Sequence, residues 1–247
     1  MRTKTFLGLL FACLFAGSGV IAQGPVVIYD PLRKVSEKSF TDADEQLVKT
    51  RILPKIRTRW SNDSGCDGSS LAVIAAADGS FTKKAAAQRA VLYEICQTGN
   101  GFANNGIAIV ENENVIANFV AAGGWNLDIV RIADINANGF DEIAIETGGG
   151  MHQGYTGSSS NVIEISVTSV KSLGTFLAYS NECESLKPGQ YCDRSYKITA
   201  KPGIKPSFLS QKHINKGDDE KPKWVASGKP QAAKTISGVD TKYELVK

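Results

Sequence analysis

The feature that most constrains the fold is a succession of short β-type runs from residue 70 to the end of the chain. Apolar or alternating stretches are separated by turn-forming Gly, Asn and Asp. Short strands at such regular spacing are typical of sandwiches, barrels and propellers. We therefore predict a mainly β fold, whose clearest strands are Leu71–Ala77, Ala90–Cys96, Gly106–Val110, Val115–Val120, Ile129–Ala133, Ile143–Glu146, Val162–Val167 and Leu173–Tyr179, followed by shorter runs at Tyr196–Thr199, Ser207–Leu209, Trp224–Ala226 and Tyr243–Val246.

A single helix is predicted over about 42–60. Thr41 or Asp42 is positioned to cap it, and Pro54 should kink or divide it. Apolar residues recur every three or four positions on one face, namely Leu47, Val48, Ile52, Ile56 and Trp60. With the strand-like Val26–Tyr29, this helix forms an N-terminal segment, 23–65, ahead of an all-β domain, 66–247.

The first 22 residues resemble a secretory signal peptide. Arg2 and Lys4 precede an apolar run, and small residues lead to a cleavage site between Ala22 and Gln23. A lipoprotein box ending at Cys13 is the weaker alternative, because Phe11 fits such a box poorly. No later run approaches the roughly 20 apolar residues of a membrane span. We therefore expect a secreted or periplasmic protein.

Four cysteines remain after this cleavage, and an even number in an exported chain favours disulfides. Three pairings are possible. The sequence-local one, Cys66–Cys96 with Cys183–Cys192, is the pairing that we favour.

The segment 130–145 holds the one motif with a specific chemistry. Oxygen-bearing side chains recur at every second position, a glycine follows them, and β-type runs lie on both sides. Ca²⁺ takes six to eight oxygen ligands in flexible geometry. We predict a structural Ca²⁺ site formed by the side chains of Asp134, Asn136, Asn138 and Glu142 and the carbonyl of Phe140, with Gly139 allowing the turn. The alternative is a metal-free loop held by Asx-turns.

This loop and its flanks, about 127–168, resemble one FG-GAP repeat of the kind found in integrin α propellers and VCBS-type proteins. After the acidic loop come a strand, Ile143-Ala144-Ile145, a glycine-rich loop with Gly148-Gly149-Gly150, Gly154 and Gly157, and another strand, Asn161–Ile165. The resemblance implies the same five ligands, an outward-pointing Asp141, and a role in adhesion, recognition or scaffolding.

Two departures from the family limit what the resemblance implies. Two ligand positions carry Asn rather than Asp, so the Ca²⁺ affinity should be modest. Only one clear copy of the repeat is present, whereas a full propeller needs several. The expected architecture is therefore a small or incomplete propeller-like domain, with a barrel or sandwich as the alternative.

No catalytic constellation stands out. The chain has two histidines, His152 and His213, and lacks G-x-S-x-G and HExxH motifs. His152 lies in the glycine-rich stretch, and Trp125 and Tyr155 are the aromatic residues that could join it in a ligand-binding loop. Four carboxylates near the acidic loop are not paired by the sequence: Asp128, Asp141, Glu146 and Glu164.

The leading functional hypothesis is an exported, non-catalytic β domain that is stabilised by Ca²⁺ and acts as a binding, adhesion or envelope-associated module. Its ligand would be a protein or a glycan that the sequence does not name. Nucleic acid is not expected, because the formal net charge is only +3 and basic residues do not alternate with aromatic ones. The alternatives are a secreted hydrolase acting on saccharides or phosphoesters, and a carbohydrate-binding module.

Overall fold

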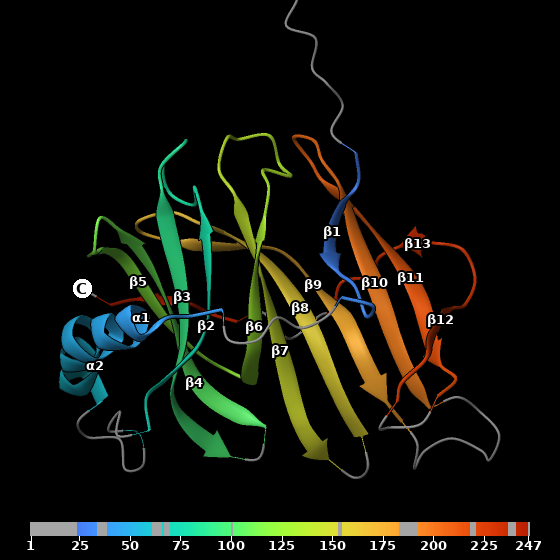
Figure 1. Cartoon of the computed structure of the whole chain (residues 1–247), viewed down its shortest axis with the longest axis horizontal. Coiled ribbons are helices and arrows are strands. Elements are labelled where there is room, and N and C mark those ends of the chain that lie inside the picture. Colours follow the sequence, from blue (N-terminus) through green and yellow to red (C-terminus); the bar gives the residue numbers. More distant parts are fainter. Residues whose placement is uncertain are drawn as a thin grey trace, which may run out of the picture.

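A computed structural model describes residues 24–33, 39–60, 66, 70–99, 101–152, 155–182, 192–217, 221–236 and 241–246. The predicted signal peptide therefore lies outside the described residues. A helical segment and two antiparallel sheets make up the described part of the chain (Figure 1). The prediction of a mainly β fold with one N-terminal helical segment is confirmed. Each sheet ends in edge strands rather than closing on itself within the described residues.

The five-stranded sheet has the order β14-β5-β4-β3-β2. Its strands are β2 (Ala72–Gly79), β3 (Gln88–Gly99), β4 (Phe102–Glu111), β5 (Asn114–Gly123) and β14 (Glu244–Leu245). The predicted hairpin between β4 and β5 is present, with a two-residue turn in which Asn112 and Glu113 both have positive φ, 49° and 62°. Such turns match the twist of the strands that they join.

The nine-stranded sheet contains the path β12-β11-β10-β9-β8-β7-β6, while β1 pairs with β10 and β13 with β11. Its strands are β1 (Val26–Tyr29), β6 (Trp125–Ile132), β7 (Glu142–His152), β8 (Tyr155–Ile165), β9 (Val170–Asn181), β10 (Asp193–Lys201), β11 (Ser207–Asn215), β12 (Trp224–Ala226) and β13 (Gln231–Ala232). In Figure 1, β6 is the edge strand of this sheet next to the five-stranded sheet, and it contacts β2.

The predicted glycine-rich loop is mostly strand. Gly148 pairs with Ser158, and Gly149 with Gly157, in the β7–β8 ladder. The prediction was wrong because glycine is not only a loop former. A Cβ on Gly124, just before β6, would lie 2.4 Å from the backbone oxygen of Gly148, so the backbones approach closely here.

The helical segment consists of α1 (Asp42–Leu47), a π-helical turn η1 (Val48–Ile52) and α2 (Leu53–Trp60). Thr41 is the N-cap, and it forms a capping box with Asp44. Pro54 is the second residue of α2, two positions after the end of η1. Proline lacks an N–H and crowds the carbonyl four residues earlier, so the wider turn at this place fits the predicted division of the helix.

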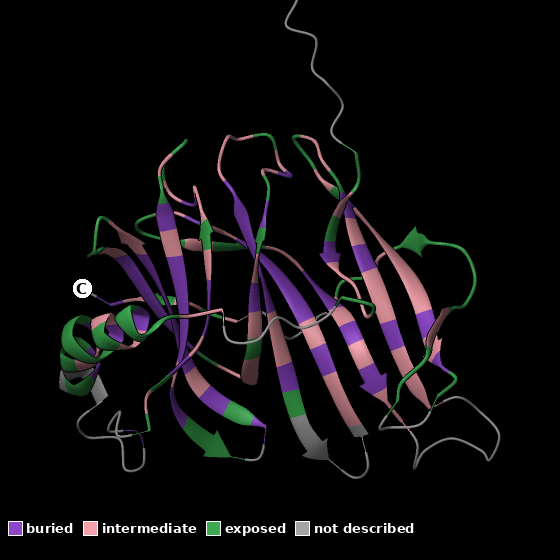
Figure 2. Ribbon diagram, in the orientation of Figure 1, coloured by how far each residue is buried: buried purple, intermediate pink, exposed green. Residues whose placement is uncertain are grey.

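Three apolar clusters form the core. The first packs the helical segment on the five-stranded sheet through Val48, Ile52 and Ile56, which are all fully buried. The second lies between the sheets and joins residues of β2–β5 to Ile129, Ile143, Ile145, Ile163 and Ile165. The third joins β1, β7, β8, β9 and β10 through Ile28, Ala144, Val162, Phe176, Ile198 and Ala200. Residues 142–145 of β7 and 160–163 of β8 are buried without a break (Figure 2), because the second cluster covers one face of these strands and the third covers the other.

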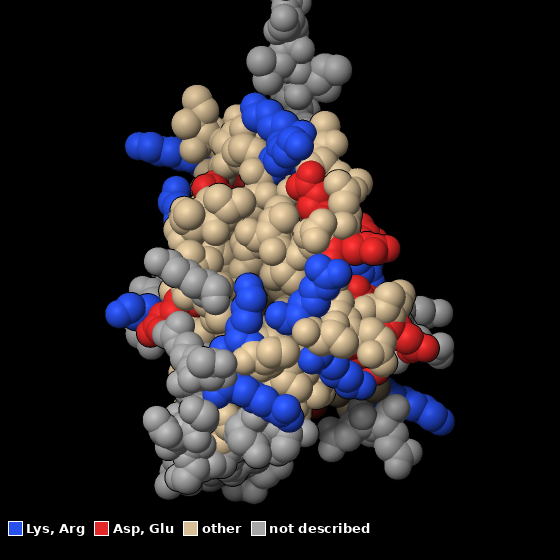
Figure 3. All heavy atoms as spheres, turned by 90° about the vertical axis from the view of Figure 1, so that its left-hand side faces the viewer, with Lys and Arg blue, Asp and Glu red and all other residues tan. Residues whose placement is uncertain are grey.

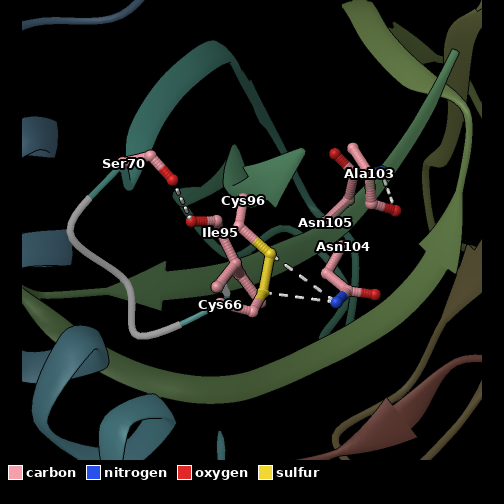
Figure 4. The surroundings of a disulfide bond; sticks show 7 residues. All are labelled: Cys66, Ser70, Ile95, Cys96, Ala103, Asn104 and Asn105. Carbon is pink, nitrogen blue, oxygen red and sulfur yellow. Dashed lines mark hydrogen bonds between the residues drawn. A yellow bond between two sulfur atoms is a disulfide. The ribbon is translucent and has the colours of Figure 1, made fainter. Parts of the chain in front are cut away.

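The predicted disulfide Cys66–Cys96 is formed, with Cα atoms 5.4 Å apart (Figure 4). It is buried, and the amide of Asn104 on β4 lies 3.3 Å and 3.7 Å from its two sulfurs. Cys192 is also disulfide-bonded. Its predicted partner, Cys183, lies outside the described residues.

Candidate functional site

The acidic loop connects β6 to β7 and is held by its own side chains. The Asp134 carboxylate accepts the N–H groups of Asn138 and Gly139, at 2.9 Å and 2.8 Å. The Asn136 Oδ1 accepts the N–H of Asn138 at 3.1 Å, and the Asn138 Oδ1 accepts that of Phe140 at 2.8 Å. Gly139 has a φ of +89°, a left-handed conformation that favours glycine. The loop is thus wound around the oxygens that the sequence singled out.

Glu142 closes this loop from the first position of β7. Its side chain is fully buried, and its Oε2 accepts the N–H of Ile135 at 2.8 Å. The buried Oε1 has no hydrogen-bond partner. Burial, together with the nearby charges of Asp134 and Glu164, raises the pKa of Glu142 to about 7. A buried carboxylate oxygen without a donor is costly unless a cation or proton meets it.

The donor set of this loop suits a hard cation. Its atoms are carboxylate, amide and carbonyl oxygens, which Ca²⁺ prefers, and each carboxylate oxygen already in a hydrogen bond has another lone pair. Among the described residues, no group of three or more His, Cys, Asp or Glu side chains is arranged to hold a metal. The loop offers two such residues, Asp134 and Glu142, and its remaining oxygens are amides and a carbonyl.

Asp141 turns away from the other loop side chains and is buried. Its carboxylate accepts two bonds from the Arg131 guanidinium, at 2.8 Å and 3.0 Å, and one from the Ser80 N–H at 2.8 Å. Burial raises the pKa of Asp141, but the bonds from Arg131 and Ser80 outweigh it and hold the pKa below its usual range. Asp141 therefore fastens the loop to the segment after β2.

A cleft of about 860 Å³ opens beside this contact. The helical segment lines it through Leu47 and Arg51, and β4 lines it through Val110. Arg131 and Asp141 also line it, so the acidic loop borders the cleft. Sequence reasoning did not find this cleft, because its lining comes from separate segments that only the fold brings together.

The charges in the cleft are largely paired. Arg89 donates to Asp44 through Nε and Nη2, at 2.8 Å and 2.9 Å, and to Asp78 at 2.9 Å. Burial raises the pKa of Asp44, but the bonds from Arg89 and Thr41 hold it below its usual range. Arg131 is half exposed and uses only part of its guanidinium on Asp141, so it still has donors for a ligand.

Lys and Arg side chains gather on the helical side of the molecule (Figure 3). Lys49, Arg51, Lys55 and Arg57 are exposed on η1 and α2, while the acidic residues of this segment lie in the first turn of α1. Acids at the start of a helical segment and bases toward its end complement the helix dipole. The helix dipole is thus a sufficient physical reason for this arrangement.

The predicted ligand-loop residues lie at one end of the nine-stranded sheet. Trp125 begins β6 opposite Gly148, and its Nε1 is buried without a hydrogen-bond partner. His152 and Tyr155 face each other in the β7–β8 ladder, and their side chains lie outside the described residues. His213 is buried on β11, with Nδ1 3.1 Å from the Gln211 carbonyl.

Two of the carboxylates left unpaired by the sequence stand opposite each other. Asp128 on β6 pairs in register with Glu146 on β7. Asp128 forms an ion pair with Arg33, and Glu146 accepts a hydrogen bond from the Ser158 hydroxyl at 3.1 Å. Burial raises the pKa of Glu146, the Ser158 bond lowers it, and the net direction is upward.

Comparison of the chain with protein-family models, with curated proteins and with solved structures finds no match. Among the described residues, none of the helices has the length and apolar character needed to cross a bilayer.

Proposed function

We propose that this protein is an exported binding module whose β scaffold is stabilised by Ca²⁺ in the loop 134–142. The observation that carries the proposal is the buried Glu142 Oε1, which lacks a partner inside a loop of oxygen donors. A cation held by Asp134, Asn136, Asn138, the Phe140 carbonyl and Glu142 would supply that partner. When bound, Ca²⁺ would neutralise the repulsion among the loop carboxylates.

The cleft supports binding rather than catalysis. Asp44 and Asp141, its buried carboxylates, are both held by arginines, so neither is poised to take a proton. Apolar surface from Leu47 and Val110, together with the remaining donors of Arg131, is the combination typical of ligand sites. Because Asp141 links the loop to Arg131, the metal would hold one wall of the cleft in place. The ligand would be a protein or glycan in the compartment outside the cell membrane.

Export is supported by the N-terminal sequence pattern and by the bonded cysteines. Disulfides persist in oxidising compartments and are rare in the cytosol. Cell fractionation of the tagged protein, with N-terminal sequencing of the mature chain, tests this part. Cleavage after Ala22 is expected, and an uncleaved cytosolic protein would contradict it.

Calcium binding is tested by thermal unfolding of the oxidised protein in EDTA and in increasing CaCl₂. A ligand that binds only the folded state raises the midpoint in proportion to ln(1 + [L]/Kd). Asp134→Ala should abolish this rise. Asp128→Ala, the same change outside the loop, should keep it. No rise in the wild type up to several millimolar Ca²⁺ would overturn the metal site.

Ligand binding is tested on a glycan array and a panel of extracellular-matrix and envelope proteins, with and without Ca²⁺. Leu47→Arg should place a large charged side chain in the cleft and remove binding. Lys55 on α2 does not line the cleft, so Lys55→Gln should leave binding unchanged. Hits that survive Leu47→Arg unchanged would place the binding surface elsewhere.

The Asp128–Glu146 pair favours a second candidate, a glycoside hydrolase. Directly opposed residues have Cβ atoms about 5 Å apart, so the two carboxyl groups are neighbours on one sheet face. Retaining glycosidases hold their two carboxyl groups about 5–5.5 Å apart. Glu146, whose pKa is raised, would be the acid and Asp128 the nucleophile. Activity on aryl glycosides that is lost in Glu146→Gln would support this function, and inactivity on a broad panel would reject it.

A further inference from the structure

We propose that Glu164, on β8, is a positioning residue of the Ca²⁺ site, which orients its two amide ligands and adds a third negative charge beside it. This inference rests on the proposed function, because it concerns the same loop. The sequence pattern of the loop does not include Glu164, which lies on the strand after β7 and joins the site only through the fold.

Glu164 holds the two amide ligands of the loop. Its Oε2 accepts hydrogen bonds from Asn136 Nδ2 at 2.5 Å and from Asn138 Nδ2 at 2.7 Å. Bonds to an ionised acceptor are stronger than neutral ones. With the nitrogen ends fixed on Glu164, the Oδ1 atoms turn back to the loop, where they accept the backbone N–H groups of Asn138 and Phe140. Each Oδ1 has a second lone pair for a cation.

Glu164 also compensates for the missing charge. Asn replaces Asp at two ligand positions, so the loop itself brings only Asp134 and Glu142. Because its carboxylate contacts the amides of Asn136 and Asn138, the charge of Glu164 lies directly beside the loop. Lys171 is opposite Glu164 across β8 and β9, yet the hydrogen bonds of Glu164 run to the loop amides. Ligand charge and site rigidity set Ca²⁺ affinity, and Glu164 contributes to both.

The position of Glu164 also gives the cation a route. A surface groove of about 620 Å³ is lined by Asn136, Asn138 and Glu164 and also by two lysines, Lys171 and Lys205, and the apolar Leu173 and Phe208. Glu142 lies on the inner side of the loop and is fully buried. A cation entering through the groove would meet the amides and Glu164 first and Glu142 last.

The test is calorimetric titration of the full, oxidised protein with CaCl₂, comparing wild type, Glu164→Ala and Glu164→Gln. Loss of a residue that orients metal ligands typically raises Kd 10–100-fold, and this range is expected for Glu164→Ala. Glu164→Gln keeps an oxygen that accepts from both amides but lacks the charge, so its Kd should lie between those of the wild type and Glu164→Ala. Glu113→Gln, in the exposed β4–β5 turn, is the control and should match the wild type.

The outcomes separate the inference from the proposed function. If the wild type binds Ca²⁺ and Glu164→Ala binds it equally well, Glu164 has no part in the site. If Glu164→Gln and Glu164→Ala are equally weak, Glu164 acts through charge alone and the positioning role is wrong. If the wild type does not bind Ca²⁺, both proposals fail together. Equal unfolding midpoints of the variants in EDTA show that the loss of affinity is not a loss of folding.

Discussion

The ring of Tyr93 on β3 lies over Gly106, its direct partner on β4. A Cβ on Gly106 would stand 2.1 Å from Tyr93 Cζ, so no side chain fits there. Tyr93 is fully buried, and its hydroxyl donates to Asn118 Oδ1 on β5 at 2.7 Å. One glycine thus lets a single aromatic residue cross-link three neighbouring strands.

Gly106→Ala should therefore destabilise the protein by about 1–3 kcal/mol or more, because the tyrosine must move and lose its hydrogen bond. Urea unfolding measures this. Gly149→Ala on β7 is the matched control, since its Cβ would have its nearest neighbour 3.9 Å away. If the two substitutions lower the free energy of unfolding equally, the loss comes from replacing glycine in a strand rather than from the Tyr93 contact.

Glu142→Gln should uncouple stability from calcium. The variant removes a buried charge that lies near two other carboxylates, so its unfolding midpoint in EDTA should equal or exceed that of the wild type. The rise with CaCl₂ should shrink or vanish, because an anionic ligand is lost. Thermal unfolding in both buffers checks this. A large loss of stability in EDTA would contradict the predicted sign.

The Arg89–Asp44 pair should make stability depend on acid pH. The pKa of Asp44 in the folded state lies below its ordinary 3.8, so the pair contributes fully above about pH 4. That contribution is lost as the pH falls through the lower, folded-state pKa. Arg89→Gln should cost about 2 kcal/mol at pH 7, and the difference from the wild type should narrow toward pH 2–3. Urea unfolding at several pH values measures this. If the free energies of unfolding of the wild type and Arg89→Gln differ by the same amount at every pH, the pair does not cause the pH dependence.

The Cys66–Cys96 bond should contribute about 3–4 kcal/mol, the loop-entropy value for its sequence separation of 30. A Cys66→Ala/Cys96→Ala double variant, compared with the wild type in guanidinium, measures this contribution. Treatment of the wild type with a reductant reports on both cystines, whereas the double variant isolates this one. A loss below 1 kcal/mol would mean that the unfolded chain without this disulfide retains structure around Ile95 and Asn104.

Local chemistry allowed much of the fold to be predicted. Residues close in sequence determine the Thr41 cap, the break at Pro54 and the β4–β5 hairpin. The even number of cysteines pointed to the Cys66–Cys96 pair. The strand role of Gly148 and Gly149 was missed because only the packing of the neighbouring backbone shows why glycine is needed there. The cleft and the contact of Glu164 with the loop amides were missed because residues from separate strands meet only once the sheets have formed.

The pairing of β1 with β10 has a consequence for how the chain reaches this fold. Val26 is the partner of Ala200, so the first described strand finds its place only after most of the chain is present. Such distant pairing slows folding and leaves unpaired strand edges exposed in the meantime. In the export that we propose, Val26–Tyr29 would cross the membrane first and stay unpaired until β10 had crossed. Assembly of the nine-stranded sheet would then follow near-completion of transport.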